Sequence, residues 1–167
     1  MKTKTFFLTT LMFVFLLMCS TGIQAQTAKP KLDQAKLMQQ WLGTWEATTG
    51  KDTVEVWEAK LYGKSFIGNV SLNIKGKNSP FYTANFCLDS KEGNMKGFNL
   101  DFNGEYLTWI GIWTTEKQFS IEAVQNYKPE TVNGKAELFY ETLTSMIYTE
   151  FNTTGLKTRE YKFKKTK

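Results

Sequence analysis

The stretch Ser-Phe-Ile-Gly-Asn-Val-Ser-Leu-Asn-Ile, residues 65–74, alternates apolar and polar side chains with a period of two. Successive side chains of a strand point to opposite faces, so Phe66, Val70 and Leu72 share one face and Asn69 lies on the other. An apolar face of this kind needs a core to cover it. Similar segments recur along the chain about every eight to twelve residues with turn signals between them, a pattern typical of an all-β sandwich or barrel.

The alternation predicts about ten strands, preceded by one short amphipathic helix over residues 32–42. Strands joined by hairpins leave two exposed edges unless the sheet closes on itself, so we expect a closed antiparallel up-and-down barrel rather than a sandwich. The predicted strands are 44–49, 53–60, 64–75, 81–89, 94–102, 105–114, 118–126, 135–142, 146–152 and 156–165.

One hairpin offers a detailed prediction. Asn-Gly between two alternating runs, at residues 103 and 104, is a strong signal for a two-residue turn. The resulting register pairs Leu100 with Leu107 and Phe98 with Trp109, and directs these side chains into the barrel. Lys96 then also points inward, where it either reaches water at a barrel end or helps to hold an anionic ligand.

The N-terminus predicts export. Residues 1–25 carry two lysines, an apolar run too short for a comfortable membrane span, and a small-residue cleavage site, which together indicate a signal peptide. Lipid attachment at Cys19 is an alternative that the bulky Met18 disfavours. We expect residues 26–31 to be a flexible leading segment and residues 32–167 to form one barrel domain. We expect a periplasmic or extracellular protein with no membrane span.

The composition excludes several function classes. The chain has no histidine and only two cysteines, so Ser-His-Asp catalysis, histidine-ligated haem and the usual zinc sites are excluded, and we expect no metal and no cofactor. The net charge of +5 is mild and its lysines are scattered, which argues against nucleic acid. An enzyme is not expected. Carboxylate catalysis remains the alternative, although Glu55 with Glu58 and Glu137 with Glu141 have unsuitable spacings.

Arg159 is the only arginine among 21 basic residues, and it shares a strand face with Tyr161 and Phe163. A guanidinium is selected over an ammonium where it stacks on an indole or grips a carboxylate with two bonds. Two interpretations stay open. Arg159 and Tyr161 anchor the acidic group of a ligand, or Arg159 is a structural plug that stacks on Trp45 or pairs with an internal glutamate.

The segments Leu42-Gly43-Thr44-Trp45 and Thr158-Arg159-Glu160-Tyr161 resemble the calycin superfamily, which includes lipocalins, avidins and fatty-acid-binding proteins. The resemblance implies that Gly43 and Trp45 have structural roles at the closed end of a barrel. It further implies that Arg159 and Tyr161 hold a lipid carboxylate. The chain departs from fatty-acid binders because Gly50-Lys51-Asp52 leaves no room for their helical lid.

We therefore expect an exported barrel that binds a small, largely apolar ligand, with or without an acidic head group. The alternative is a protein-interaction or inhibitor module with a filled barrel that contacts a partner through rim loops such as 127–134. The residues expected to line the ligand site are Trp57, Phe98, Leu100, Trp109, Trp113 and Tyr140, with Arg159, Tyr161 and Lys96 as polar anchors.

Overall fold

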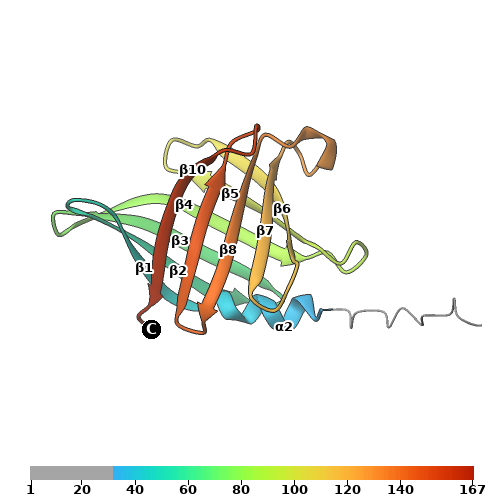
Figure 1. Cartoon of the computed structure of the whole chain (residues 1–167), viewed down its shortest axis with the longest axis horizontal. Helices are drawn as coiled ribbons and strands as arrows, with labels where there is room; N and C mark the ends of the chain where they lie inside the picture. The colour runs from blue at the N-terminus through green and yellow to red at the C-terminus, as the bar shows by residue number, and fades with distance from the viewer. Residues whose placement is uncertain (1–31) are drawn as a thin grey trace, which may run out of the picture. The chain divides into compact units, whose positions relative to one another are not determined.

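Ten antiparallel strands form a closed barrel in which every strand pairs with its neighbours in sequence and β1 pairs with β10 (Figure 1). The structure is a computed structural model and describes residues 32–167. The predicted closed all-β barrel is confirmed, with β1 and β10 in register at Trp45–Lys165 and Glu46–Lys164, near the C-terminal end of β10. The expected signal peptide, Cys19 and the lead over 26–31 lie outside the described residues.

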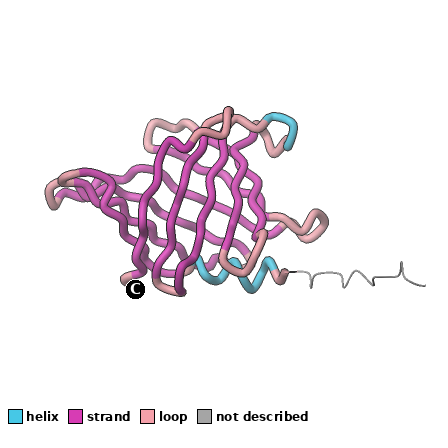
Figure 2. Tube along the Cα trace, in the orientation of Figure 1, coloured by secondary structure: helices cyan, strands magenta, loops and turns pink. Residues whose placement is uncertain are grey.

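The elements follow one another with short connections, as the tube in Figure 2 shows. A helical segment comes first and consists of α2, Gln34–Met38, and a 3-10 turn, Gln39–Trp41. The strands are β1 Gly43–Gly50, β2 Thr53–Tyr62, β3 Ser65–Ile74, β4 Lys77–Leu88, β5 Met95–Asp101, β6 Tyr106–Trp113, β7 Gln118–Val124, β8 Gly134–Thr142, β9 Ser145–Phe151 and β10 Lys157–Lys165.

The helical segment covers one end of the barrel (Figure 1). Gln34 binds the backbone of Trp113 twice, because its side-chain nitrogen donates to the carbonyl at 3.0 Å and its oxygen accepts from the amide at 2.8 Å. Gln40 donates to the carbonyl of Glu116 in the β6–β7 turn at 3.1 Å. In an up-and-down barrel the turns alternate between the two ends, so this end also carries the β2–β3, β4–β5 and β8–β9 turns. We call it the helix end and the other the mouth.

The β5–β6 register differs from the prediction by one residue. Gly97 pairs with Trp109 and Leu100 with Tyr106. The connection is a three-residue loop in which the amide of Gly104 donates to the carbonyl of Asp101, and Gly104 takes a φ of +86°. The Asp101 carboxylate accepts from two loop amides at 2.9 Å, which stabilises this turn over the two-residue form.

A shift of one residue moves every side chain of a strand to the other face. The prediction that Lys96, Phe98 and Leu100 point inward is therefore wrong. Phe98 and Leu100 are 39% and 43% exposed on the outer wall. Gly97 takes the inward position, where a Cβ would overlap the Trp109 ring. The absence of a side chain at Gly97 makes space for the indole.

Aromatic and aliphatic side chains fill the helix end of the barrel. Trp113 contacts Phe119 and Tyr140, with ring centroids 5.3 and 5.2 Å apart. Trp41, from the 3-10 turn, packs on the ring of Phe86 at 4.8 Å. Burial of such rings stabilises the closed end and leaves the free volume on the mouth side. The most deeply buried side chains are Trp45, Trp113, Tyr140, Phe66, Phe119, Phe163, Met95, Leu138, Met146 and Val124.

Candidate ligand-binding site

A cavity of about 280 Å³ lies inside the barrel. It extends from Trp41 and Tyr140, near the helix end, to Glu150 and Thr158 near the β9–β10 turn. Its wall is mainly apolar, and four of the five tryptophans of the chain contribute to it. Small residues on adjoining strands keep it from being filled, namely Ala59, Gly68, Ala84, Ala123, Gly134 and Ala136.

Gly43 and Trp45 form the junction where the barrel closes. Gly43 has a φ of +107°, and a Cβ there would collide with the carbonyl oxygen of Lys167, so glycine is required. Trp45 is 1% exposed and its indole nitrogen donates to the carbonyl of Trp41 at 3.1 Å. The Lys165 ammonium lies 5.3 Å from the centre of the Trp45 ring. The cation that covers this tryptophan is thus Lys165.

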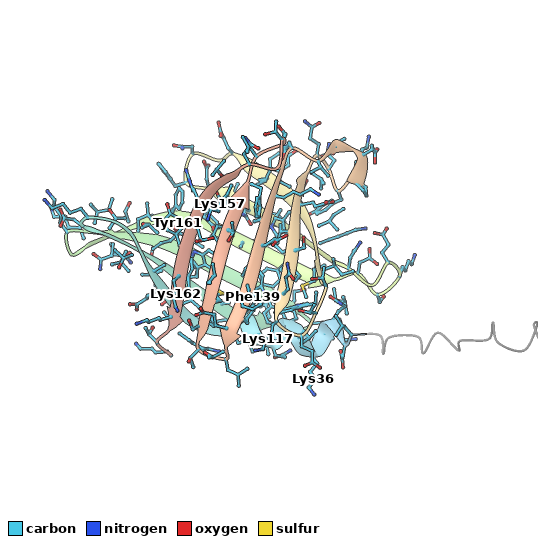
Figure 3. All side chains as sticks on the ribbon, viewed as in Figure 1. Lys36, Lys117, Phe139, Lys157, Tyr161 and Lys162 are labelled. Carbon is cyan, nitrogen blue, oxygen red and sulfur yellow. The ribbon has the colours of Figure 1, made fainter. Side chains whose placement is uncertain are left out.

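Arg159 lies far from Trp45, toward the mouth. It faces inward on β10 in register with Glu150, and it lies six positions before Lys165, about 20 Å along a strand. Figure 3 labels Lys157 and Tyr161, which flank Arg159 on this part of β10. The Arg159 side chain is 58% exposed, and its Nε lies 3.6 Å from the nearer oxygen of Glu150. This distance indicates a loose ion pair rather than a hydrogen bond.

Polar side chains gather on the inward faces of the mouth. Trp57 donates through Nε1 to Oε1 of Glu55 at 2.6 Å, and Tyr148 donates to Oε1 of Glu150 at 2.7 Å. Trp57 packs edge-on against Tyr148 with ring centroids 5.2 Å apart. Trp57, Tyr148 and Glu150 line the cavity, as does Tyr82. The apolar cavity therefore ends at a polar, aromatic wall.

The electrostatics of this wall follow from burial and from the two carboxylates. Burial raises the pKa of Glu55 above its usual value, and the neighbouring charge of Glu150 adds to this effect. The Trp57 hydrogen bond and the charge of Arg159 oppose it. Burial also raises the pKa of Tyr82 and of Tyr148, and both carboxylates reinforce the effect. Both phenols are therefore neutral hydrogen-bonding groups near neutral pH.

Two polar atoms of cavity-lining residues are buried without a hydrogen-bond partner in residues 32–167. They are the indole nitrogen of Trp41 and the hydroxyl of Tyr140. Buried polar groups normally have a hydrogen-bond partner, so two such groups without one, in residues that line a cavity, are unusual. A third lining group is satisfied internally, because Trp109 donates to the side-chain oxygen of Asn99 at 3.0 Å.

The predicted site residues divide into three groups. Trp57, Trp109 and Tyr140 line the cavity. Trp113 is buried in the core at the helix end, and Tyr161 is half-buried in register with Tyr148; neither belongs to the cavity wall. The remaining residues lie elsewhere: Phe98, Leu100 and Lys96 on the outer wall and Arg159 at the mouth.

The Lys96 side chain lies on the outer surface of the barrel and pairs with two carboxylates there. Its ammonium lies 2.9 Å from a carboxylate oxygen of Asp89 and 3.1 Å from one of Glu92. The hydrogen bond from Lys96 holds the pKa of Asp89 below its usual value. An internal anchoring role for Lys96 is thus inconsistent with its position.

Sequence reasoning missed Trp41, Tyr82, Tyr148 and the two inward carboxylates, Glu55 and Glu150. A signal was present for some of them. Glu55 and Trp57 are two apart on one strand, as are Tyr148 and Glu150, so each pair shares a face. Trp41 precedes the first strand, and only the docking of the helical segment over the barrel brings it to the cavity.

No protein-family profile and no curated protein matches the sequence. No helix within residues 32–167 is long and apolar enough to cross a membrane. In the same residues, no three acidic or cysteine side chains cluster in a way that could hold a metal ion. The case for function therefore depends on the cavity and its wall.

Proposed function

We propose that this protein is an exported, calycin-like barrel that binds one small, largely apolar ligand in its interior. The observation that supports this most directly is the 280 Å³ cavity with its aromatic lining. Its volume lies just below the range typical of small-molecule sites, about 300–1,000 Å³. Burial of apolar ligand surface would supply most of the affinity, at about 25 cal/mol per Å² before ordering costs.

The buried polar atoms of Trp41 and Tyr140 add a second argument. A ligand that hydrogen-bonds to either atom removes an unfavourable feature of the free protein. The helical segment over the barrel and the closed ten-stranded topology are compatible with membership of the calycin superfamily. The alternative, a filled barrel that acts through rim loops such as 127–134, requires an interior without free volume, and the cavity argues against it.

Binding can be tested by intrinsic fluorescence, since four tryptophans line the cavity. The probe is 1-octanol, which is neutral and apolar. Ala84→Leu extends a side chain into the cavity, and we expect it to weaken octanol binding at least tenfold. The control is Thr83→Leu, which places a leucine at the adjacent position on the outer face and should leave binding unchanged. Equal binding by both variants would count against an interior site.

Native mass spectrometry of protein purified from its own host is the complementary measurement. A retained ligand would appear as a mass increment that is lost on denaturation and absent from Ala84→Leu. A protein mass that corresponds to a chain beginning at Gln26 would support the proposed export and cleavage.

A further inference from the structure

Among the side chains that face into the barrel at its mouth, carboxylates outnumber cations. Glu55, Glu150 and Arg159 face inward there. Arg159 lies beside Glu150, so this pair is approximately neutral. Asp101 also has inward register, but its carboxylate is occupied by the amides of its own turn. Among the described residues Glu55 has no cation in direct contact, and the charge of Arg159 acts on it only from a distance.

Glu55 has one oxygen available for a ligand. Oε1 accepts the hydrogen bond from Trp57, whereas Oε2 accepts none from residues 32–167. In the same residues, no lysine or arginine nitrogen lies within 4.0 Å of this carboxylate. A half-buried carboxylate normally has a charged or multiply hydrogen-bonding partner, because desolvation is costly without one.

Aromatic rings lie close to Glu55, beginning with Trp57, which donates a hydrogen bond to it. Trp57 and Tyr148 meet edge to face at 5.2 Å, and both line the cavity with Tyr82. Tyr82 and Tyr148 are close enough to Glu55 for its charge to raise their pKa values. Aromatic rings close to a carboxylate form a favourable environment for an ammonium group.

From this geometry we infer that the ligand carries a cationic amine, which sits at the mouth against Glu55 and the rings of Trp57, Tyr82 and Tyr148, while its apolar body fills the cavity. The inference rests on the proposed ligand-binding function and names the ligand class. It replaces the acidic head group expected from Arg159 and Tyr161, since the arginine already faces a carboxylate. An anionic head group would meet Glu150 and Glu55 at the same place.

Three octyl compounds test the head group because they share one apolar chain. We expect octylammonium to bind at least tenfold more tightly than 1-octanol, and octanoate to bind most weakly, measured by titration calorimetry at neutral pH and low salt. Similar affinities for octylammonium and 1-octanol, or tighter binding of octanoate, would overturn the inference and leave the proposed function intact. Failure of all three to bind would overturn both.

Glu55→Gln keeps the size of the side chain and an oxygen acceptor for Trp57. It should reduce octylammonium affinity about tenfold and leave that of 1-octanol unchanged. Glu160→Gln, which removes an exposed outer-face charge on β10, is the control for net charge and should change neither affinity. An equal effect of Glu55→Gln on both compounds would mean that Glu55 acts only on the fold.

The wild-type protein provides an independent readout of pH dependence. The ammonium favours ionised Glu55, so octylammonium affinity should fall as the pH is lowered through the raised pKa of Glu55, while 1-octanol affinity stays constant. The groups facing Glu55 are Trp57, Tyr82, Tyr148, Glu150 and Arg159. Of these only Glu150 is a second carboxylate, and the part of the pH dependence that disappears in Glu55→Gln is the part due to Glu55. A flat octylammonium profile would contradict the inference.

Discussion

Gly97 lies directly across the β5–β6 ladder from Trp109, and the indole occupies the space that a side chain at Gly97 would need. Gly97→Ala should therefore destabilise the protein by about 1–3 kcal/mol, because overpacking forces the ring or the strand to shift. Urea unfolding followed by circular dichroism measures the change.

The matched control is Gly50→Ala. Gly50 also lies in a strand, and a Cβ there would make only ordinary contacts with Thr53 at 3.5 Å. Its change in unfolding free energy should stay within about 0.5 kcal/mol. Equal stability of the two variants would refute the packing argument and the revised register.

The contact between Gln34 and Trp113 predicts how the helical segment is held. Gln34→Ala removes both hydrogen bonds and should cost about 1–3 kcal/mol, since the partly buried backbone amide of Trp113 loses its partner. Hydrogen exchange at Trp113 should accelerate. The control is Gln39→Ala, in the same helical segment. The exposed side chain of Gln39 makes no hydrogen bond in residues 32–167, so hydrogen exchange at Trp113 should match the wild type.

The two cations of β10 are expected to differ in their effect on stability. Lys165→Met removes the ammonium over Trp45 and should cost about 0.5–1 kcal/mol. Arg159→Ala removes an exposed, loosely paired side chain and should change the unfolding free energy by less than about 0.5 kcal/mol. Denaturant titrations of both variants compare them directly. Unfolding of Arg159→Ala would instead support the structural plug.

Tyr140→Phe tests the unpaired hydroxyl. The hydroxyl is buried without a partner among the described residues, so its removal should leave the ligand-free protein equally stable or up to about 1 kcal/mol more stable. Tyr148→Phe, the comparison, loses a hydrogen bond to Glu150 and should cost about 1 kcal/mol. Thermal unfolding of both proteins without ligand is the measurement, and a large loss in Tyr140→Phe would indicate an internal partner for the hydroxyl.

Much of the fold was predictable because it depends on local patterns. The alternation in residues 65–74 corresponds to β3, Ser65–Ile74, and the predicted strands differ from the observed ones mainly at their ends. The helix expected over 32–42 appears as α2 and a 3-10 turn. Closure was predicted from the need to pair the edge strands, and Gly43 lies where the first strand meets the end of the last one.

The β5–β6 register was not obtained because two turns compete for the same residues. Asn103-Gly104 favours a two-residue loop, but Asp101 can accept from two amides of the longer loop, with Gly104 at its positive-φ position. An aspartate three residues before a glycine was the signal for this turn. Overlooking it reversed the faces of β5, and the lining residues assigned to that strand were wrong.

The alternation of apolar and polar residues is a property of neighbouring positions. It was therefore enough to predict a sheet of many strands that closes on itself. The tertiary structure decided which positions share the interior. Burial, and hence the electrostatics at Glu55, depends on strands distant in sequence, because Tyr82, Tyr148 and Glu150 reach it only across the closed barrel. The cavity exists for the same reason: its small lining residues come from separate strands, and no single segment reveals that they meet.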